Sequence, residues 1–125
     1  MNKPLISIVI VVFNAQNTIE DCIKSVLHQS PFYELIVIDG LSQDNTVNIL
    51  QKYKDYISYF VSEKDKGIYD AMNKGIDGSK GEYIYFIGSD DVFYSNDTLS
   101  KAAVILEKEK PDLLLGNMMY KNNVV

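Results

Sequence analysis

The segment at residues 5–13 is a nearly unbroken apolar run, and most of its residues are β-branched. This pattern is typical of a strand covered on both faces, and it predicts the central strand of a parallel sheet. The run ends at the polar residues 14–17, which fit a turn into a helix. Apolar residues then recur at the spacing of one helical face, at Ile19, Cys22, Ile23, Val26 and Leu27.

Strand and helix patterns alternate along the rest of the chain. Further strands are predicted at residues 35–38, 57–61, 83–87 and 112–120, with helical patterns between them. This alternation predicts an α/β fold, a doubly wound and mainly parallel sheet with helices on both faces. We expect the five strands in one sheet, with the first at the centre. The second and fourth strands should lie beside it, and the third beyond the second.

Two elements carry more specific predictions. The strand at residues 83–87 is an apolar and aromatic run, so we expect it to be covered on both faces. Gly75 lies inside a helical pattern, where it costs roughly 1 kcal/mol relative to Ala, so close packing is its expected justification. The inner face of that helix is predicted to comprise Ile68, Ala71, Met72, Gly75 and Ile76.

The composition limits the class of protein. With 125 residues, 46% of them hydrophobic, the chain is long enough for one domain with its own core. Its net charge is −5 and all 12 basic residues are Lys, so nucleic-acid binding is not expected. Cys22 is the only cysteine, which excludes an intramolecular disulfide and a Cys-rich metal site. The sequence has no signal peptide and no apolar run of membrane-spanning length, so we expect a cytoplasmic protein.

Polar residues stand at three predicted strand ends: Asn14, Asp39, and the run Ser89, Asp90 and Asp91. Right-handed crossovers bring these ends to one edge of the sheet, where open α/β sheets bind ligands. Two adjacent carboxylates repel each other, and a divalent cation relieves the repulsion. For these two residues alone, a solvated Asp-Asp loop is the alternative. The sequence has no glycine-rich phosphate loop, so a metal held by Asp91 would neutralise a bound pyrophosphate instead.

Four ordered blocks of the sequence resemble glycosyltransferase family 2. They are residues 7–14, residues 34–40 with Ser42, Asp44 and Thr46, residues 65–76, and residues 81–83 with 89–91. The resemblance covers nearly the whole chain. It implies the GT-A fold, a Rossmann-like nucleotide-diphospho-sugar transferase fold. It also implies a nucleotide-sugar site at the carboxyl ends of the strands and a DxD motif that binds Mn²⁺ or Mg²⁺.

The resemblance assigns roles to individual residues. Asp91 matches the metal ligand of the motif and Asp90 its neighbour that faces the ribose, whereas Ser89 stands where many members have Asp. Asp39 matches the first acid of an Asp-Asp-Gly-Ser motif. In some relatives the second acid contacts the base, and Gly40 stands at that second position. The other residues expected to bind the nucleotide sugar are Val11, Val12, Phe13 and Asn14 at the first strand, Lys66 near the diphosphate, and Asn73.

The resemblance also implies the reaction. A metal-dependent, inverting glycosyltransferase would move a sugar from its nucleotide to a hydroxyl acceptor, a saccharide or a lipid-linked sugar. Such enzymes serve polysaccharide or glycolipid synthesis, often at the inner face of the membrane. Their catalytic base is a carboxylate well beyond the DxD motif. Residues 1–125 are therefore expected to be a single nucleotide-sugar-binding domain, truncated before the acceptor-binding half, with the base beyond Val125 and no activity alone.

Two other classes stay open at this point. A non-catalytic nucleotide-binding module would need only the donor site. A signalling receiver domain has a similar size, a doubly wound sheet and a Mg²⁺ site. It would require an acidic pair directly after the first strand, where residues 13–15 are Phe, Asn and Ala. The acceptor, the donor's base and the oligomeric state are likewise left open by the sequence.

Overall fold

The computed structural model describes residues 4–29, 33–112, 119–120 and 123–124. Its strands are β1 (Ile6–Val12), β2 (Tyr33–Asp39), β3 (Tyr59–Ser62), β4 (Tyr83–Gly88), β5 (Met119–Tyr120) and β6 (Asn123–Val124). Its helices are α1 (Ile19–Leu27), α2 (Thr46–Gln51), the short 3-10 helix η1 (Lys54–Tyr56), α3 (Ile68–Gly78) and α4 (Thr98–Glu109). The predicted alternation of strands and helices is confirmed through α4.

The main sheet has four strands in the order β3-β2-β1-β4. All three strand pairs are parallel, and the register places Val9 of β1 opposite Ile36 of β2 and Phe86 of β4. The predicted central position of the first strand, between the second and the fourth, and the predicted place of the third beyond the second are therefore confirmed. Because the strands are parallel, their carboxyl ends lie at one edge of the sheet.

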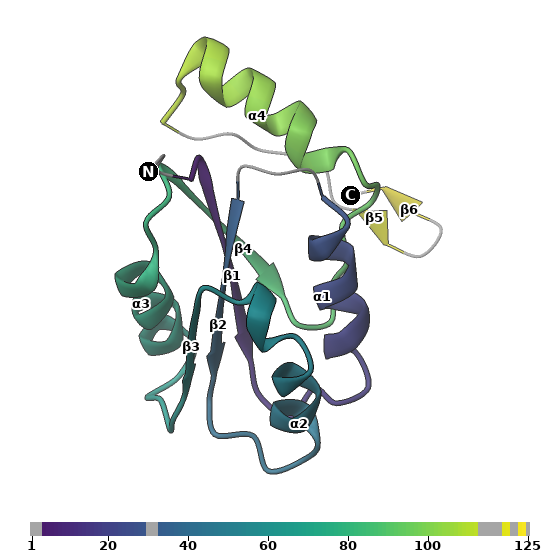
Figure 1. Ribbon diagram of the computed structural model, residues 1–125, viewed down its shortest axis with the longest axis vertical. Coiled ribbons are helices and arrows are strands. Elements are labelled where there is room, and N and C mark those ends of the chain that lie inside the picture. The colour runs from purple at the N-terminus through teal and green to yellow at the C-terminus, as the bar shows by residue number, and fades with distance from the viewer. Residues whose placement is uncertain (1–3, 30–32, 113–118, 121–122, 125) are drawn as a thin grey trace.

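Helices cover both faces of this sheet, as Figure 1 shows with α1 and α2 on one side and α3 on the other. Side chains of a strand alternate between faces, so β1 contributes to two cores. Ile8 and Ile10 belong to the larger core, which includes buried residues of α1, α2 and α4. Val9 belongs to the smaller core, where it lies with Ala71 of α3. The β-branched run of β1 is thus explained by burial on both sides.

Two of the burial predictions are wrong. β4 is an edge strand of the described sheet, and Tyr85 on it is 46% exposed, so its apolar run is not covered on both faces. In α3, Ile68 and Ile76 are also exposed, and only Ala71 and Gly75 are buried. In the described residues the core on this face contains no residue of another helix that could cover Ile68 and Ile76. At Gly75, however, the helix lies close to the sheet. A Cβ atom added to Gly75 would lie 2.4 Å from Val9 Cγ1, so the predicted role of Gly75 in close packing is confirmed.

The predicted fifth strand does not join the main sheet in the part that is described. Residues 113–118 lie outside the described residues. Met119–Tyr120 instead pairs antiparallel with Asn123–Val124, forming the two-stranded sheet β5-β6. Antiparallel strands can be joined by a connection of two residues, whereas a parallel neighbour requires a long crossover.

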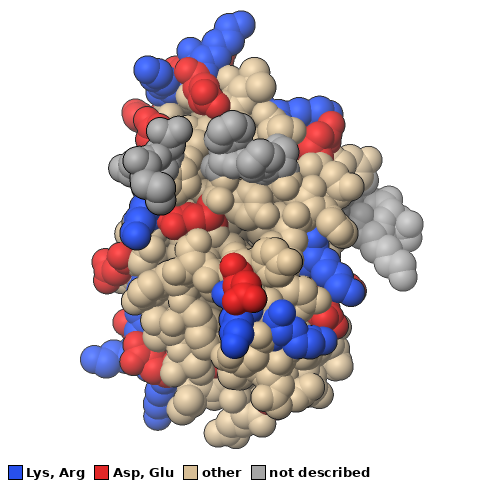
Figure 2. Space-filling view, in the orientation of Figure 1, with Lys and Arg blue, Asp and Glu red and all other residues tan. Residues whose placement is uncertain are grey.

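On the face of the molecule shown in Figure 2, acidic and lysine side chains are intermixed.

Candidate functional site

The carboxyl ends of the four parallel strands bring distant segments together. The register places Val12 opposite Asp39, Val11 opposite Gly88, and Asp39 opposite Ser62. The loops that follow these strands therefore start side by side. Each loop carries polar or acidic residues, so this edge concentrates the groups that the sequence singles out.

Asp39 is fully buried, and its carboxylate is held by three donors. Its Oδ2 accepts hydrogen bonds from the backbone N–H of Ser42 at 3.0 Å and from the Ser62 hydroxyl at 2.7 Å. Its Oδ1 accepts a hydrogen bond from the Ser42 hydroxyl at 2.5 Å. Three donors to a carboxylate compensate for the loss of water around it. Both oxygens are therefore engaged in shaping the turn that follows β2.

The turn after β2 also holds the loop between β1 and α1 in place. Asn14 adopts a left-handed backbone conformation, with φ of 48°, which Asn tolerates better than most residues. Its side-chain Oδ1 accepts a hydrogen bond from Gln43 N–H at 2.8 Å. Three consecutive backbone N–H groups of the β1–α1 loop also donate hydrogen bonds to side chains of the segment that follows β2. These are Asn14 to Ser42 Oγ at 2.8 Å, Ala15 to Thr46 Oγ1 at 2.9 Å and Gln16 to Asp44 Oδ2 at 3.2 Å.

Asp44 has a second role at the start of α2. Its Oδ1 accepts a hydrogen bond from Thr46 N–H at 2.9 Å, so its carboxylate joins the beginning of this helix to the β1–α1 loop. Hydrogen bonds from Thr46, and a weaker one from Gln16, hold the pKa of Asp44 below its usual value. The two loops thus form one cross-linked surface.

Asp90 and Asp91 follow β4 in a tight turn, in which Asp91 N–H donates to the Gly88 carbonyl at 3.0 Å. Both carboxylates lie on the same side of this turn. A Cβ atom added to Gly88 would be 2.7 Å from Asp91 Oδ2 and 3.1 Å from Asp90 Oδ1. Beneath them the Cys22 thiol donates to the same carbonyl at 3.4 Å. Burial, with the charges of Asp91 and Asp90, raises the pKa of Cys22 to about 12.

The chemistry of these carboxylates fits a hard divalent cation. In the described part of the chain, lysine ion pairs involve Glu20, Glu63, Asp70 and Asp97, and none of the strand-end acids. Nor do the described residues bring together three or more His, Cys, Asp or Glu side chains. Mg²⁺ is commonly bound by one or two carboxylates, with phosphates and water completing its coordination. Two adjacent, unneutralised carboxylates suit a metal of this kind.

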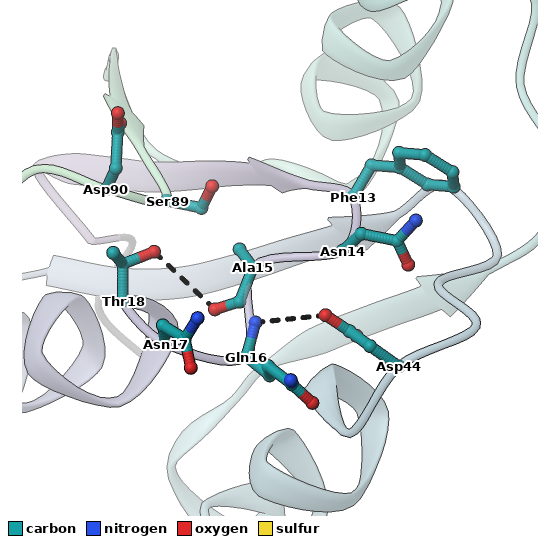
Figure 3. A pocket seen from close by; sticks show the side chains of 9 residues that line it. All are labelled: Phe13, Asn14, Ala15, Gln16, Asn17, Thr18, Asp44, Ser89 and Asp90. Carbon is teal, nitrogen blue, oxygen red and sulfur yellow. Dashed lines mark hydrogen bonds between the residues drawn. The ribbon is translucent and has the colours of Figure 1, made fainter.

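A cavity of about 440 Å³ lies beside them. Figure 3 shows Ser89 and Asp90 on one side, Asp44 on the other, and the β1–α1 loop between them. The cavity is lined by Phe13, Asn14, Ala15, Gln16, Asn17, Thr18, Asp44, Ser89 and Asp90. Its lining is polar except for Phe13 and Ala15. The arrangement can hold a polar or anionic ligand next to a metal.

The structure separates the residues that the sequence assigns to the site. Phe13, Asn14, Ser89 and Asp90 line the cavity, and Asp91 lies next to them. Val11 and Val12 end β1, with Val12 buried. Lys66 and Asn73 do not line this cavity; both are exposed, at the start of α3 and along it.

Sequence reasoning misses one acid at this edge. Asp65, in the loop between β3 and α3, places its carboxylate against Gly40. A Cβ atom added to Gly40 would lie 2.9 Å from Asp65 Oδ2 and 3.5 Å from Phe13 Cδ1. Phe13 is 60% exposed, and its ring and the Asp65 carboxylate border the same space above Gly40. The sequence places Asp65 at the start of the resembling block 65–76 without assigning it a role, and position 40 lacks a side chain.

The sequence model of the protein family "Glycosyl transferase family 2" matches residues 7–125 of this chain. A PGL/p-HBAD biosynthesis glycosyltransferase of Mycobacterium tuberculosis is 34% identical over 127 residues, which cover 98% of this chain and 50% of the relative. The putative teichuronic acid biosynthesis glycosyltransferase TuaG of Bacillus subtilis is 39% identical over 103 residues, covering 79% of this chain and 40% of the relative. The chain thus spans half or less of the length of these curated relatives.

Solved structures show the same similarity. S. aureus TarS 1–349 in complex with UDP-GlcNAc is 25% identical, with a TM-score of 0.86, over 97% of this chain and 36% of that one. The mannosyltransferase PcManGT from Pyrobaculum calidifontis, in complex with GDP-Man and Mn²⁺, has a TM-score of 0.76. It is 23% identical over 84% of this chain and 33% of that one, so this likeness concerns the fold alone.

Proposed function

Because this chain belongs to glycosyltransferase family 2 and has the GT-A fold, we propose that it binds the nucleotide-diphosphate sugar of a glycosyl transfer reaction. The donor would lie at the carboxyl ends of β1, β2 and β4. One observation carries this proposal: Asp90 and Asp91 are adjacent, unneutralised by lysine in the described residues, and next to a polar cavity. Family membership excludes the receiver-domain alternative. A non-catalytic nucleotide-binding module of this family remains the second candidate.

Each part of the edge has a proposed task. Asp91 would hold Mn²⁺ or Mg²⁺, and Asp90 would face the ribose. When bound, the metal would neutralise the diphosphate as it departs. The exposed ring of Phe13 offers a flat apolar surface for the base, with Val11, Val12 and Asn14 supporting it. Lys66, just before α3, and Asn73, in the middle of that helix, are proposed to approach the ligand from the other side. The complex of TarS with UDP-GlcNAc supports this choice of ligand.

The whole reaction requires more than the donor site. Transfer to a hydroxyl acceptor needs a group that positions the acceptor and a base that removes its proton. This chain matches half or less of its relatives, so we propose that the acceptor site and a carboxylate base belong to the part of those enzymes that it does not match. Transfer by an inverting mechanism, to a saccharide or lipid-linked acceptor, is part of this proposal.

The membrane location is also a proposal. We place the reaction in the cytoplasm, at the inner face of the membrane, because acceptors of this family are often assembled there. None of the described helices is long and apolar enough to cross a bilayer.

Metal-dependent nucleotide binding tests the proposed function. Titration calorimetry with UDP and GDP, in Mn²⁺ and then in excess EDTA, should show binding only with the metal. Asp91→Asn should abolish that binding while leaving thermal stability unchanged or slightly raised, because one of two repelling charges is removed. Asp77→Asn, at an exposed position of α3, is the matched control and should bind like the wild type. Equal affinity of the wild type and Asp91→Asn for the nucleotide in Mn²⁺ would exclude Asp91 as the residue that holds the metal.

Activity measurements separate the enzyme from a non-catalytic module. Incubation with several nucleotide sugars and simple hydroxyl acceptors, followed by mass detection, should give no transfer above background from residues 1–125. A protein of the relatives' length that contains this domain should give metal-dependent transfer. Sustained transfer by the 125 residues would contradict the proposed division of tasks.

A further inference from the structure

We propose that Asp65 replaces the missing acid at position 40 and accepts a hydrogen bond from a ring N–H of the donor's base. This inference rests on the proposed function and adds a preference among bases. Its starting point is the geometry at Gly40, where a Cβ atom would lie 2.9 Å from Asp65 Oδ2 and 3.6 Å from Asp65 Cγ. The Asp65 carboxylate therefore occupies the space into which a side chain at position 40 would project.

The loop that carries Asp65 is held in place from α3. Asp65 Oδ1 accepts a hydrogen bond from Gly67 N–H at 3.2 Å, and Gly67 has a φ of 114°, which favours glycine. Lys66 N–H donates to Asp70 Oδ2 at 2.8 Å. This hydrogen bond and the charge of Lys74 hold the pKa of Asp70 below its usual value. The loop is thus anchored by an ionised acid on the helix.

Lys74 supplies a second anchor for the same loop. Its Nζ donates to the Lys64 carbonyl at 3.3 Å and pairs with Glu63 Oε1 at 3.3 Å and Asp70 Oδ2 at 3.6 Å. The side chain of Lys74 is only 21% exposed. A carboxylate on a loop fixed at both sides can bind a ligand without the cost of ordering that loop.

One oxygen of Asp65 is left for a ligand. Oδ1 is bound to Gly67, whereas within the described residues no hydrogen bond or ion pair engages Oδ2. A carboxylate can only accept hydrogen bonds, so its partner must be a donor. The adjacent exposed ring of Phe13 provides a surface on which a planar heterocycle can stack. An aromatic face next to a lone acceptor is suited to a base that presents an N–H in its ring plane.

The chemistry of the bases gives a specific preference. Uracil has a ring N3–H and guanine a ring N1–H, whereas N3 of cytosine is an acceptor that would face the carboxylate unfavourably. Two acceptors brought together lose the hydrogen bond and leave both groups unpaired. UDP or GDP should therefore bind at least about tenfold more tightly than CDP, since hydrogen bonds to charged groups have this strength.

Dissociation constants of UDP, GDP and CDP in Mn²⁺, for four forms of the protein, test the inference. The wild type and the Asp77→Asn control should both prefer UDP or GDP. Asp65→Asn should weaken the preferred diphosphate about tenfold or more and leave CDP unchanged or tighter, because the new amide can donate to cytosine. Gly40→Ala should act in the same direction, because its Cβ would displace the Asp65 carboxylate. Thermal melting of each variant verifies that it is folded.

The outcomes distinguish this inference from the proposed function. If UDP and GDP bind to Asp65→Asn as they do to the wild type, Asp65 does not contact the base, and the donor site itself stands. An equal loss of all three diphosphates in Asp65→Asn would also overturn the inference, because it would indicate a role unrelated to the base. If no nucleoside diphosphate binds to the wild type in Mn²⁺, the proposed function fails and the inference fails with it.

Discussion

Replacing Gly75 by alanine tests how closely α3 approaches the sheet. The new Cβ would lie 2.4 Å from Val9 Cγ1 and 3.4 Å from Val9 Cγ2. Carbon atoms normally pack at about 3.5–4.0 Å, so either the helix or the central strand would have to move by about 1 Å. Val9 is fully buried in β1 and has little freedom to shift. Overpacking of this kind costs about 1–3 kcal/mol.

A smaller gain opposes this cost. Alanine favours the helical state over glycine by about 1 kcal/mol. The net expectation for Gly75→Ala is a loss of up to about 2 kcal/mol in the free energy of unfolding, which for a chain of this size lowers the melting temperature by up to about 10 °C. Urea denaturation followed by circular dichroism measures the free energy, and a thermal scan gives the midpoint.

Val9→Ala provides the matched background. This change removes both methyl groups that the new Cβ would meet, so Gly75→Ala should be neutral or stabilising when Val9 is already alanine. The coupling energy of the double-mutant cycle should reach about 1–3 kcal/mol. If Gly75→Ala instead stabilises the wild type by its full helix propensity, or if the coupling is near zero, α3 does not lie as close to β1 as the structure places it.

Three further results are expected. Gly88→Ala should fold normally but weaken Mn²⁺-dependent UDP binding, because its Cβ would displace the Asp90 and Asp91 carboxylates; unchanged titrations would contradict the proposed metal site. The Cys22 thiol, buried and with its pKa raised to about 12, should resist alkylation at pH 8 until urea unfolds the protein; rapid labelling of the native protein would disprove its burial. Since the pKa of Asp44 is lowered in the folded state, its ionised form stabilises the protein above pH 4, and this effect is lost on acidification through the folded pKa. The wild type should therefore melt higher than Asp44→Asn at pH 7, with a difference that shrinks below about pH 4, whereas a difference that is constant with pH would point to another cause.

The order of the main sheet is predictable from the sequence because few structures accommodate its strands. The runs in β1 and β2 contain consecutive β-branched residues that only a two-sided core can cover, and both are buried along most of their length. Right-handed crossovers then fix their neighbours. The run in β4 looks similar, yet Tyr85 is 46% exposed, and within the described residues β4 pairs with β1 alone. An apolar run indicates a strand without indicating how many strands flank it.

The burial of α3 is less predictable for a related reason. Apolar residues at helical spacing define a wide stripe that includes Ile68 and Ile76. Only Ala71 and Gly75 of this stripe are buried, and in the described residues the core on this face contains no residue of another helix that could cover the others. The width of the buried stripe therefore depends on which elements pack beside the helix. The pattern within the helix does not contain that information.

The site combines residues of both kinds. Asn14, Asp39 and Asp91 can be found from the sequence because each follows a recognisable strand, and parallel strands end at one edge. Asp65 has no such signal, since it lies in a charged loop whose neighbours also carry acids and lysines. The pairing of β3 with β2 sets Asp39 opposite Ser62, so the loop after β3 starts next to the loop after β2. From that loop the Asp65 carboxylate reaches the space above Gly40. A glycine at a position where an acid is expected can thus be compensated by an acid on the loop after the adjacent strand, and in this chain Gly67, Asp70 and Lys74 hold that loop in place.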